Sequence, residues 1–265
     1  MLDRSRLKTA LLAAATGAMI LTSGCAGRGG GKKDTAYVAR DVDTLYSAAQ
    51  DRLKRGQTKQ AAALFDEVER QHPYSPWARR AQLMSAFSYY VARDYTKAIQ
   101  SAQRFLSIHP GNKDAPYAYY LIAVCYYEQI SDVSRDQKIT QQAKQALIDV
   151  TRRYPGTSYA TDAELKIDLV NDHLAGKEMT IGRVYERSGK WLAATLRFRN
   201  VIDNYQTTSH TPEALYRLVE AYMSLGIPEE AQKAAAVLER NYPASVWYQR
   251  AYKLLGKYAP ETIRA

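Results

Sequence analysis

Apolar and small residues recur along the chain with the spacing of helices that are buried on one face. In five separate stretches, an alanine is followed four residues later by another apolar residue, and three residues after that by Val, Phe or Leu. The five alanines are Ala61, Ala98, Ala143, Ala194 and Ala231. Because side chains three or four residues apart lie on the same side of a helix, the pattern predicts five helices that bury equivalent faces.

Proline marks the end of most of these helices. It stands twelve residues after the alanine in four of the five stretches, whereas Gln206 takes its place in the fourth stretch. The four prolines are Pro73, Pro110, Pro155 and Pro243. Since proline lacks a backbone donor and cannot continue a helix, each one is expected to separate one helical pair from the next.

A partner helix is predicted before each of these five helices. One position of this partner helix holds a small residue in the first four units, which have Ala49, Ala86, Ala123 and Gly182 there. The last unit has the larger Val219 at that position. Small residues let antiparallel helices approach closely, and larger side chains fill the space between neighbouring pairs. The pattern resembles the tetratricopeptide repeat (TPR). This resemblance implies an all-α superhelical solenoid of about five helix-turn-helix repeats, with ten or eleven helices and few or no strands.

The middle of the array is irregular. The alanines are 37, 45, 51 and 37 residues apart, so extra material lies around the third and fourth units. Residues 129–137 are expected to lengthen the hairpin of the third repeat. Residues 157–181 are expected to form an additional or extended helix.

The amino terminus has the composition of an export signal. Residues 1–9 hold three basic side chains, residues 10–21 form an apolar run of twelve, and Ser23-Gly24-Cys25 follows. This order predicts a signal peptide over residues 1–24. The end of the segment resembles the bacterial lipobox, which implies that Cys25 carries fatty acids such as palmitate. Residues 25–36 are then the lipidated cysteine and a flexible tether. The alternative is an ordinary secreted protein with a chance cysteine near its cleavage site.

Charge and composition narrow the class of protein only slightly. Hydrophobic residues make up 46% and charged residues 24% of the chain, as in folded proteins. The formal net charge is +10, of which residues 1–24 contribute +2. The remaining surplus favours acidic partners or anionic lipid, or serves solubility alone.

Motifs for catalysis, metals or cofactors are missing from the sequence. The four histidines are scattered, and neither a His-Glu-x-x-His nor a Gly-x-Ser-x-Gly motif occurs. Cys125 lies in an apolar helical stretch, where a buried inert thiol is expected. We therefore expect a protein that binds other proteins, with no catalytic residue, metal or cofactor.

Aromatic residues gather on the predicted first helices of repeats one to three, which in a solenoid form the concave face. Leu83 and Val124 lie among them. An aromatic groove with a basic edge suits an extended peptide that ends in an aromatic residue and a carboxylate. The alternative is that these rings only pack between repeats. The predicted groove residues are Tyr46, Arg80, Phe87, Tyr90, Tyr117, Tyr120 and Tyr127.

The lipobox and the irregular repeats together resemble the BamD family, also called ComL, of the β-barrel assembly (BAM) machinery. The resemblance covers nearly all of the mature chain. Its most specific stretches are GQTKQAAALFDEVERQHPYSPWARRAQLMSAFSYY (residues 56–90) and GKWLAATLRFRNVIDNY (residues 189–205).

The resemblance implies a lipoprotein scaffold on the periplasmic face of the outer membrane, with no nucleic-acid partner. The solenoid would span residues 37–265. Its amino-terminal part (37–156) would receive the carboxyl-terminal strand of unfolded barrel proteins. Its carboxyl-terminal part (157–265) would hold the barrel protein BamA, with Arg197 as a contact. Other BAM lipoproteins are further expected partners.

Two other functions fit parts of the pattern. One is a TPR lipoprotein that pilots secretin or pilus assembly, which would carry the same anchor but have no affinity for BamA. The other is a periplasmic enzyme or peptidoglycan-binding protein, which should bear clustered carboxylates or histidines in the groove; the sequence contains no evident cluster of this kind.

Overall fold

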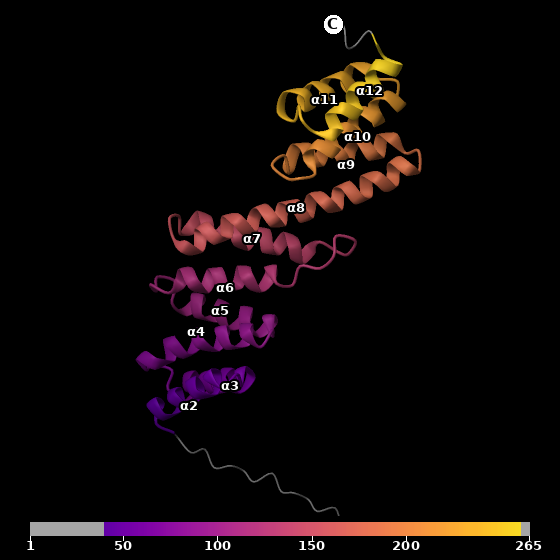
Figure 1. Ribbon diagram of the computed structural model, residues 1–265. Coiled ribbons are helices and arrows are strands. Elements are labelled where there is room, and N and C mark those ends of the chain that lie inside the picture. Colours follow the sequence, from indigo (N-terminus) through magenta and orange to yellow (C-terminus); the bar gives the residue numbers. More distant parts are fainter. Residues whose placement is uncertain (1–39, 261–265) are drawn as a thin grey trace, which may run out of the picture. The chain divides into compact units, whose positions relative to one another are not determined.

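The protein is an array of α-helices, seen in a computed structural model that describes residues 40–260 (Figure 1). These residues belong to one compact unit. They form eleven helices and no strand, as the sequence predicts. The signal peptide and lipidated cysteine predicted over residues 1–25 lie outside the described residues. The helices are α2 (Val42–Lys54), α3 (Thr58–Gln71), α4 (Pro76–Val91), α5 (Tyr95–Ile108), α6 (Ala115–Tyr127), α7 (Lys138–Arg153), α8 (Ser158–Arg187), α9 (Trp191–Asn204), α10 (Thr211–Ser224), α11 (Pro228–Asn241) and α12 (Val246–Tyr258).

Consecutive helices form stacked hairpins. Each helix from α2 to α12 packs against the next one in the chain. The first helices of neighbouring hairpins also touch, since α4 contacts α2 and α6, and α6 contacts α8. The five predicted repeats correspond to the hairpins that begin with α2, α4, α6, α8 and α10, and α12 covers the last of them.

The recurring small residues lie where the two helices of a hairpin meet, and we call this contact the seam. All five alanines of the second helices are fully buried, and so are the small residues of the first helices at Ala49, Ala86 and Ala123. The apolar residues seven positions after each of these five alanines are buried as well, as at Val68, Phe105 and Val150. The sequence pattern therefore locates the core correctly.

In four of the five hairpins, the turn between the two helices contains one residue with positive φ. Gly56, Gly189 and Gly226 fill this place with φ between 69° and 73°, which glycine adopts without steric cost. In the turn between α4 and α5, Arg93 takes the same conformation with φ of 59°. A single-residue left-handed turn thus lets the second helix fold back on the first.

The irregular middle consists of one loop and one long helix. Residues 128–137 connect α6 to α7, and Gln137 holds this loop by donating from Nε2 to the carbonyl of Arg135 at 3.0 Å. Lys177 of α8 donates to the carbonyl of Ser134 at 2.9 Å. The extra helix expected over residues 157–181 is the first part of α8, whose 30 residues continue into the fourth hairpin.

Helix α9 ends without the proline that closes the equivalent helices. The hydroxyl of Thr211 donates to the carbonyl of Gln206 at 3.0 Å, and the hydroxyl of Thr208 donates to that of Tyr205 at 2.8 Å. Carbonyl groups at the end of a helix have no hydrogen-bond donor within the helix. The hydroxyls of Thr208 and Thr211 supply those donors after α9.

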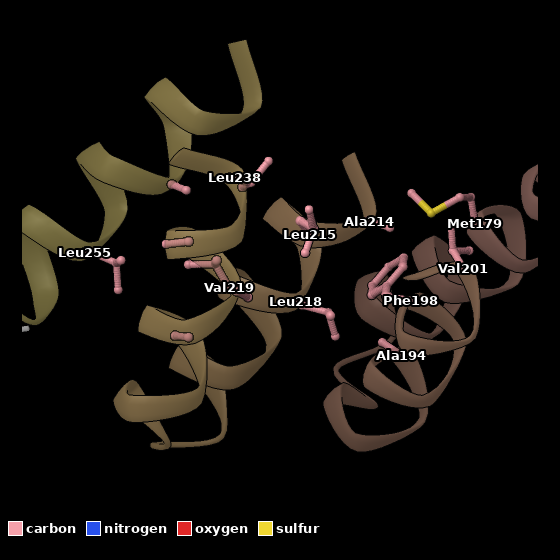
Figure 2. Packing of buried hydrophobic residues seen from close by; sticks show 14 of the residues in the cluster. Met179, Ala194, Phe198, Val201, Ala214, Leu215, Leu218, Val219, Leu238 and Leu255 are labelled. Carbon is pink, nitrogen blue, oxygen red and sulfur yellow. The ribbon is translucent and has the colours of Figure 1, made fainter. Parts of the chain in front are cut away.

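The tightest seam lies between α8 and α9. Figure 2 shows Phe198 of α9 beside Met179, Ala194 and Val201, and all four are fully buried. A Cβ atom added to Gly182 would stand 2.9 Å from Cδ1 and Cζ of the Phe198 ring, and closer still to Cε1. Only glycine leaves room for this ring.

We predict that Gly182→Ala destabilises the protein, although alanine favours a helix. Overpacking costs about 1–3 kcal/mol, which exceeds the roughly 1 kcal/mol of helix propensity that alanine adds. Urea unfolding followed by circular dichroism measures the change. Glu164→Ala, at an exposed position of the same helix, is the matched control and is expected to stay near wild type. A Gly182→Ala protein as stable as this control would show that the seam is looser than described.

Candidate functional site

Tyr46 belongs to the core and not to a groove. Its side chain is only 7% exposed, and its ring lies 5.4 Å from that of Phe65 and 4.6 Å from that of Trp77. It fills the space between α2, α3 and α4. The prediction that Tyr46 lines a groove is therefore corrected: Tyr46 is a core residue.

The other predicted tyrosines form a half-buried row on adjacent first helices. Tyr117 and Tyr120 of α6 lie 5.8 Å and 5.2 Å from the ring of Tyr159 on α8. Tyr90 of α4 lies 6.1 Å from Tyr95, and the two rings pack against the same core cluster as Tyr117. We call Tyr90, Tyr117, Tyr120, Tyr127 and Tyr159 the tyrosine surface.

The phenols of Tyr117 and Tyr120 remain protonated at neutral pH. Burial raises the pKa of Tyr117 to about 12, with a further contribution from Tyr159. Burial also raises the pKa of Tyr120, and so does the hydrogen bond that its hydroxyl donates to Asp162 Oδ2 at 2.6 Å. Lys166 pairs with the same carboxylate at 2.8 Å and lies 5.5 Å from the ring of Tyr127. The hydroxyls of Tyr117 and Tyr120 can therefore accept or donate hydrogen bonds but carry no phenolate charge.

A basic hollow of about 610 Å³ lies at the amino-terminal ends of α4 and α6. Arg79, Arg80 and Lys113 line it, with Asp114 as the acidic residue among the lining groups. Arg80 lies 5.6 Å above the ring of Trp77. Because Arg80, Phe87 and Tyr90 follow helical spacing on α4, they share the face that leads from this hollow to the tyrosine surface. Arg80 thus lies on the face where the sequence predicts a basic edge, and its role in a groove stays a prediction.

Arg197 lies in a second hollow, of about 590 Å³, between α8 and α9. Its Nη1 donates to Oε2 of Glu178 at 3.2 Å, so part of its charge is neutralised within the chain. Leu196 lines the same hollow with 63% of its surface exposed, and Leu192, one turn earlier, is 67% exposed. The ion pair with Glu178 was not predicted from the sequence.

A network of charged side chains joins the carboxyl-terminal part of α8 to α10. Arg217 lies 3.3 Å from Glu186, 3.4 Å from Glu213 and 2.9 Å from Glu220. Arg183 makes a bidentate pair with Glu213, in which Nε donates to Oε1 at 3.0 Å and Nη2 donates to Oε2 at 3.2 Å. Burial raises the pKa of the Glu186 carboxyl to about 7, against the opposing attraction of Arg217. The network was not foreseen because its members come from positions up to 37 residues apart, Arg183 to Glu220.

Three findings concern the cysteine, metal-ligating groups and membrane spans among residues 40–260. Cys125 is buried there, and burial raises the pKa of its thiol to about 12, so the prediction of a buried inert thiol is confirmed. Across residues 40–260, no three His, Cys, Asp or Glu side chains are placed to hold a metal ion. None of the described helices combines the length and the apolar character needed to cross a bilayer.

Known proteins resemble this chain over most of its length. A family model described as "YfiO: Outer membrane lipoprotein" matches residues 38–252. A Caulobacter vibrioides protein named outer membrane protein assembly factor BamD is 57% identical over 234 residues, which are 88% of this chain and 76% of that protein. The protein of the same name from Rickettsia prowazekii is 48% identical over 227 residues, covering 86% of this chain and 90% of its own. Among solved structures, the TPR domain of P58(IPK) is similar with a TM-score of 0.43 and 16% identity, over 84% of this chain and 58% of that one.

The charged network makes stability depend on pH. The pKa of Glu186 is about 7 in the folded state against an ordinary value of 4.5, so the folded state binds this proton more tightly. Its contribution to stability is fully present below pH 4.5 and is lost as pH rises through 7. We predict that the free energy of unfolding of the wild type falls between pH 5 and 8 by roughly 1–3 kcal/mol relative to Glu186→Gln.

Urea unfolding at pH 5, 6, 7 and 8 measures this difference. Glu164→Gln changes an exposed carboxylate of the same helix and is expected to follow the wild-type curve. Parallel curves for the wild type and Glu186→Gln would contradict the prediction.

Proposed function

This chain belongs to the outer membrane lipoprotein family that includes the assembly factors named BamD, and from that membership we propose that it is a non-catalytic scaffold for inserting β-barrel proteins into the outer membrane. The scaffold binds the targeting strand of an unfolded barrel protein at one end and BamA at the other. The observation that carries the proposal is the tyrosine surface, together with the basic hollow at the amino-terminal ends of α4 and α6.

A lipid anchor at Cys25 holds the scaffold at the periplasmic face of the outer membrane. Two or three acyl chains give stable attachment, because each buried methylene contributes about 0.8 kcal/mol. Other lipoproteins of the BAM machinery are further partners in this proposal.

The tyrosine surface receives the substrate strand. An extended peptide presents backbone donors and acceptors, which protonated phenols can bind, and its alternate side chains can stack on aromatic rings. A strand that ends in an aromatic residue also carries a terminal carboxylate, and Arg79, Arg80 and Lys113 give it a cationic site. Aromatic contacts and charge therefore favour the same class of peptide.

Arg197 is the contact for BamA. Its guanidinium retains donors beyond the one that Glu178 accepts, and the exposed Leu196 beside it supplies apolar area. A partner that places a carboxylate at Arg197 would compete with Glu178 for the same charge. This part of the array thus offers a partner both the charge of Arg197 and the exposed apolar surface of Leu196.

The rival role in secretin or pilus assembly has weaker support. It shares the anchor and the repeats, but the relatives with 57% and 48% identity are both named as outer membrane assembly factors. Retention of BamA from native membranes separates the two functions.

The mechanism requires no chemical step. Holding a substrate strand and BamA on one anchored array raises the local concentration of substrate beside the protein that inserts it. Binding alone performs the function.

We predict that Arg197→Glu lowers the amount of BamA that co-purifies with the tagged chain from detergent-solubilised membranes by about tenfold or more, since the charge of the contact is reversed. Arg240→Glu makes the same change on an exposed part of α11 and is expected to retain BamA. Glu178→Gln frees Arg197 from its internal partner and should retain BamA as well.

Because Arg197→Glu also places two carboxylates together, its melting temperature must be measured. Arg197→Gln, which avoids that repulsion, gives the same loss if the charge is the contact. Wild-type amounts of BamA with both variants would refute the assignment of Arg197.

We predict that Phe87→Ala combined with Tyr90→Ala weakens photo-crosslinking of a synthetic barrel carboxyl-terminal strand by about fivefold or more, because truncated aromatic anchors lose most of their contact area. Tyr252→Ala removes an exposed tyrosine from α12 and serves as the matched control. Undiminished crosslinking in the double variant would mean that the strand binds elsewhere.

A further inference from the structure

A third hollow, of about 420 Å³, opens where the carboxyl-terminal part of α8 meets α9, α10 and α12. It belongs neither to the tyrosine surface nor to the hollow that contains Arg197. We call it the acidic hollow. Its walls are Glu186, Trp191, Glu220, Met223, Leu254 and Tyr258, with Ser224 at one side.

The acidic hollow carries unbalanced negative charge in a basic protein. Glu186 and Glu220 belong to a network of three carboxylates, which also includes Glu213, and two guanidinium groups face them, those of Arg183 and Arg217. The network thus has one more carboxyl group than guanidinium groups, and it carries this excess as negative charge once Glu186 is ionised above pH 7. The described residues that line the hollow include Glu186 and Glu220 but no Lys or Arg, so this local excess attracts a cation although the whole chain carries a net charge of +10.

Aromatic and apolar walls make the hollow suitable for a long cationic side chain. Tyr258 is 62% exposed, and the ammonium of Lys257 lies 4.8 Å from its ring, so the ring already takes one cation on its face. Trp191 offers the aromatic face that binds cations best. Met223 and Leu254 can cover the methylene groups behind a charged end.

We propose that the acidic hollow binds an arginine side chain of a partner polypeptide. A guanidinium is planar, stacks on aromatic rings and pairs with carboxylates at two points, whereas the strongly hydrated ammonium of lysine gains less from such walls. The guanidinium would contact the carboxylates and the two aromatic rings, and the methylene groups of the arginine would cover the apolar floor. The inference stands whether or not the proposed scaffold function is correct, because it depends on the hollow alone.

The test uses the full chain, labelled with ¹⁵N in detergent micelles at pH 8, where Glu186 is ionised. The probe is acetyl-Gly-Arg-Gly-amide, and its citrulline analogue has the same shape without the charge. We expect the indole N–H signal of Trp191, assigned with Trp191→Phe, to shift saturably with the arginine peptide. The dissociation constant should be lower than that of the citrulline peptide by about tenfold.

Variants show whether the hollow is the site. Glu220→Gln and Tyr258→Ala should each weaken binding by about threefold or more, and Glu230→Gln, which removes an exposed carboxylate of α11, should leave it unchanged. Tyr258 is exposed, so its variant keeps the test decisive if Glu220→Gln does not fold. Equal binding of the citrulline peptide, or equal weakening by Glu230→Gln, would overturn the proposal.

The chain itself supplies a competing occupant. Arg264 follows Tyr258 by six residues and lies outside the described residues. If Arg264→Ala strengthens binding of the arginine peptide severalfold, the hollow serves the protein's own tail and the assignment to a partner is wrong. Unchanged affinity supports a partner.

Discussion

The close approach of paired helices at small residues is the constraint on which the rest of the structure depends. Each hairpin brings an alanine of its second helix against a small or medium-sized residue of its first, and these positions are fully buried. At Gly182 the approach is so close that a methyl group would overlap the ring of Phe198. Small residues on one helix leave room for a bulky side chain of the other, as Gly182 does for Phe198, and further bulky side chains lie toward neighbouring hairpins or the surface.

The binding surfaces follow from where those bulky side chains go. First helices of neighbouring hairpins touch, and tyrosines from α4, α6 and α8 therefore come into one half-buried row. Their hydroxyls meet carboxylates, as Tyr120 meets Asp162. The same rings stabilise the stack and, in the function proposed above, offer a surface to an extended peptide, so that packing and binding would be two uses of one arrangement.

Helix α8 links the candidate surfaces. Its beginning supplies Tyr159 and Asp162 to the tyrosine surface, its middle supplies Glu178 to Arg197, and its end supplies Glu186 to the acidic hollow. The hollow at α4 and α6 is basic, whereas the one at α10 and α12 is acidic. In the roles proposed for the two hollows, opposite charge would favour different partners, because like charges repel.

The helical repeat could be predicted from the sequence because buried small residues recur with the 3.6-residue period, and that period is local. The same holds for the lengthened hairpin before Lys138 and for the extended helix α8. The family, too, was recognisable from short stretches of residues. Which aromatic faces inward was decided only by tertiary structure: Tyr46 lies three residues before Ala49, as Tyr120 lies three before Ala123, but Tyr46 is enclosed by Phe65 and Trp77. Tyr159, Glu178 and the network around Arg217 were likewise invisible, because their partners come from other helices. Periodicity specifies the side of a helix that is buried, whereas contacts between distant helices depend on how the hairpins stack.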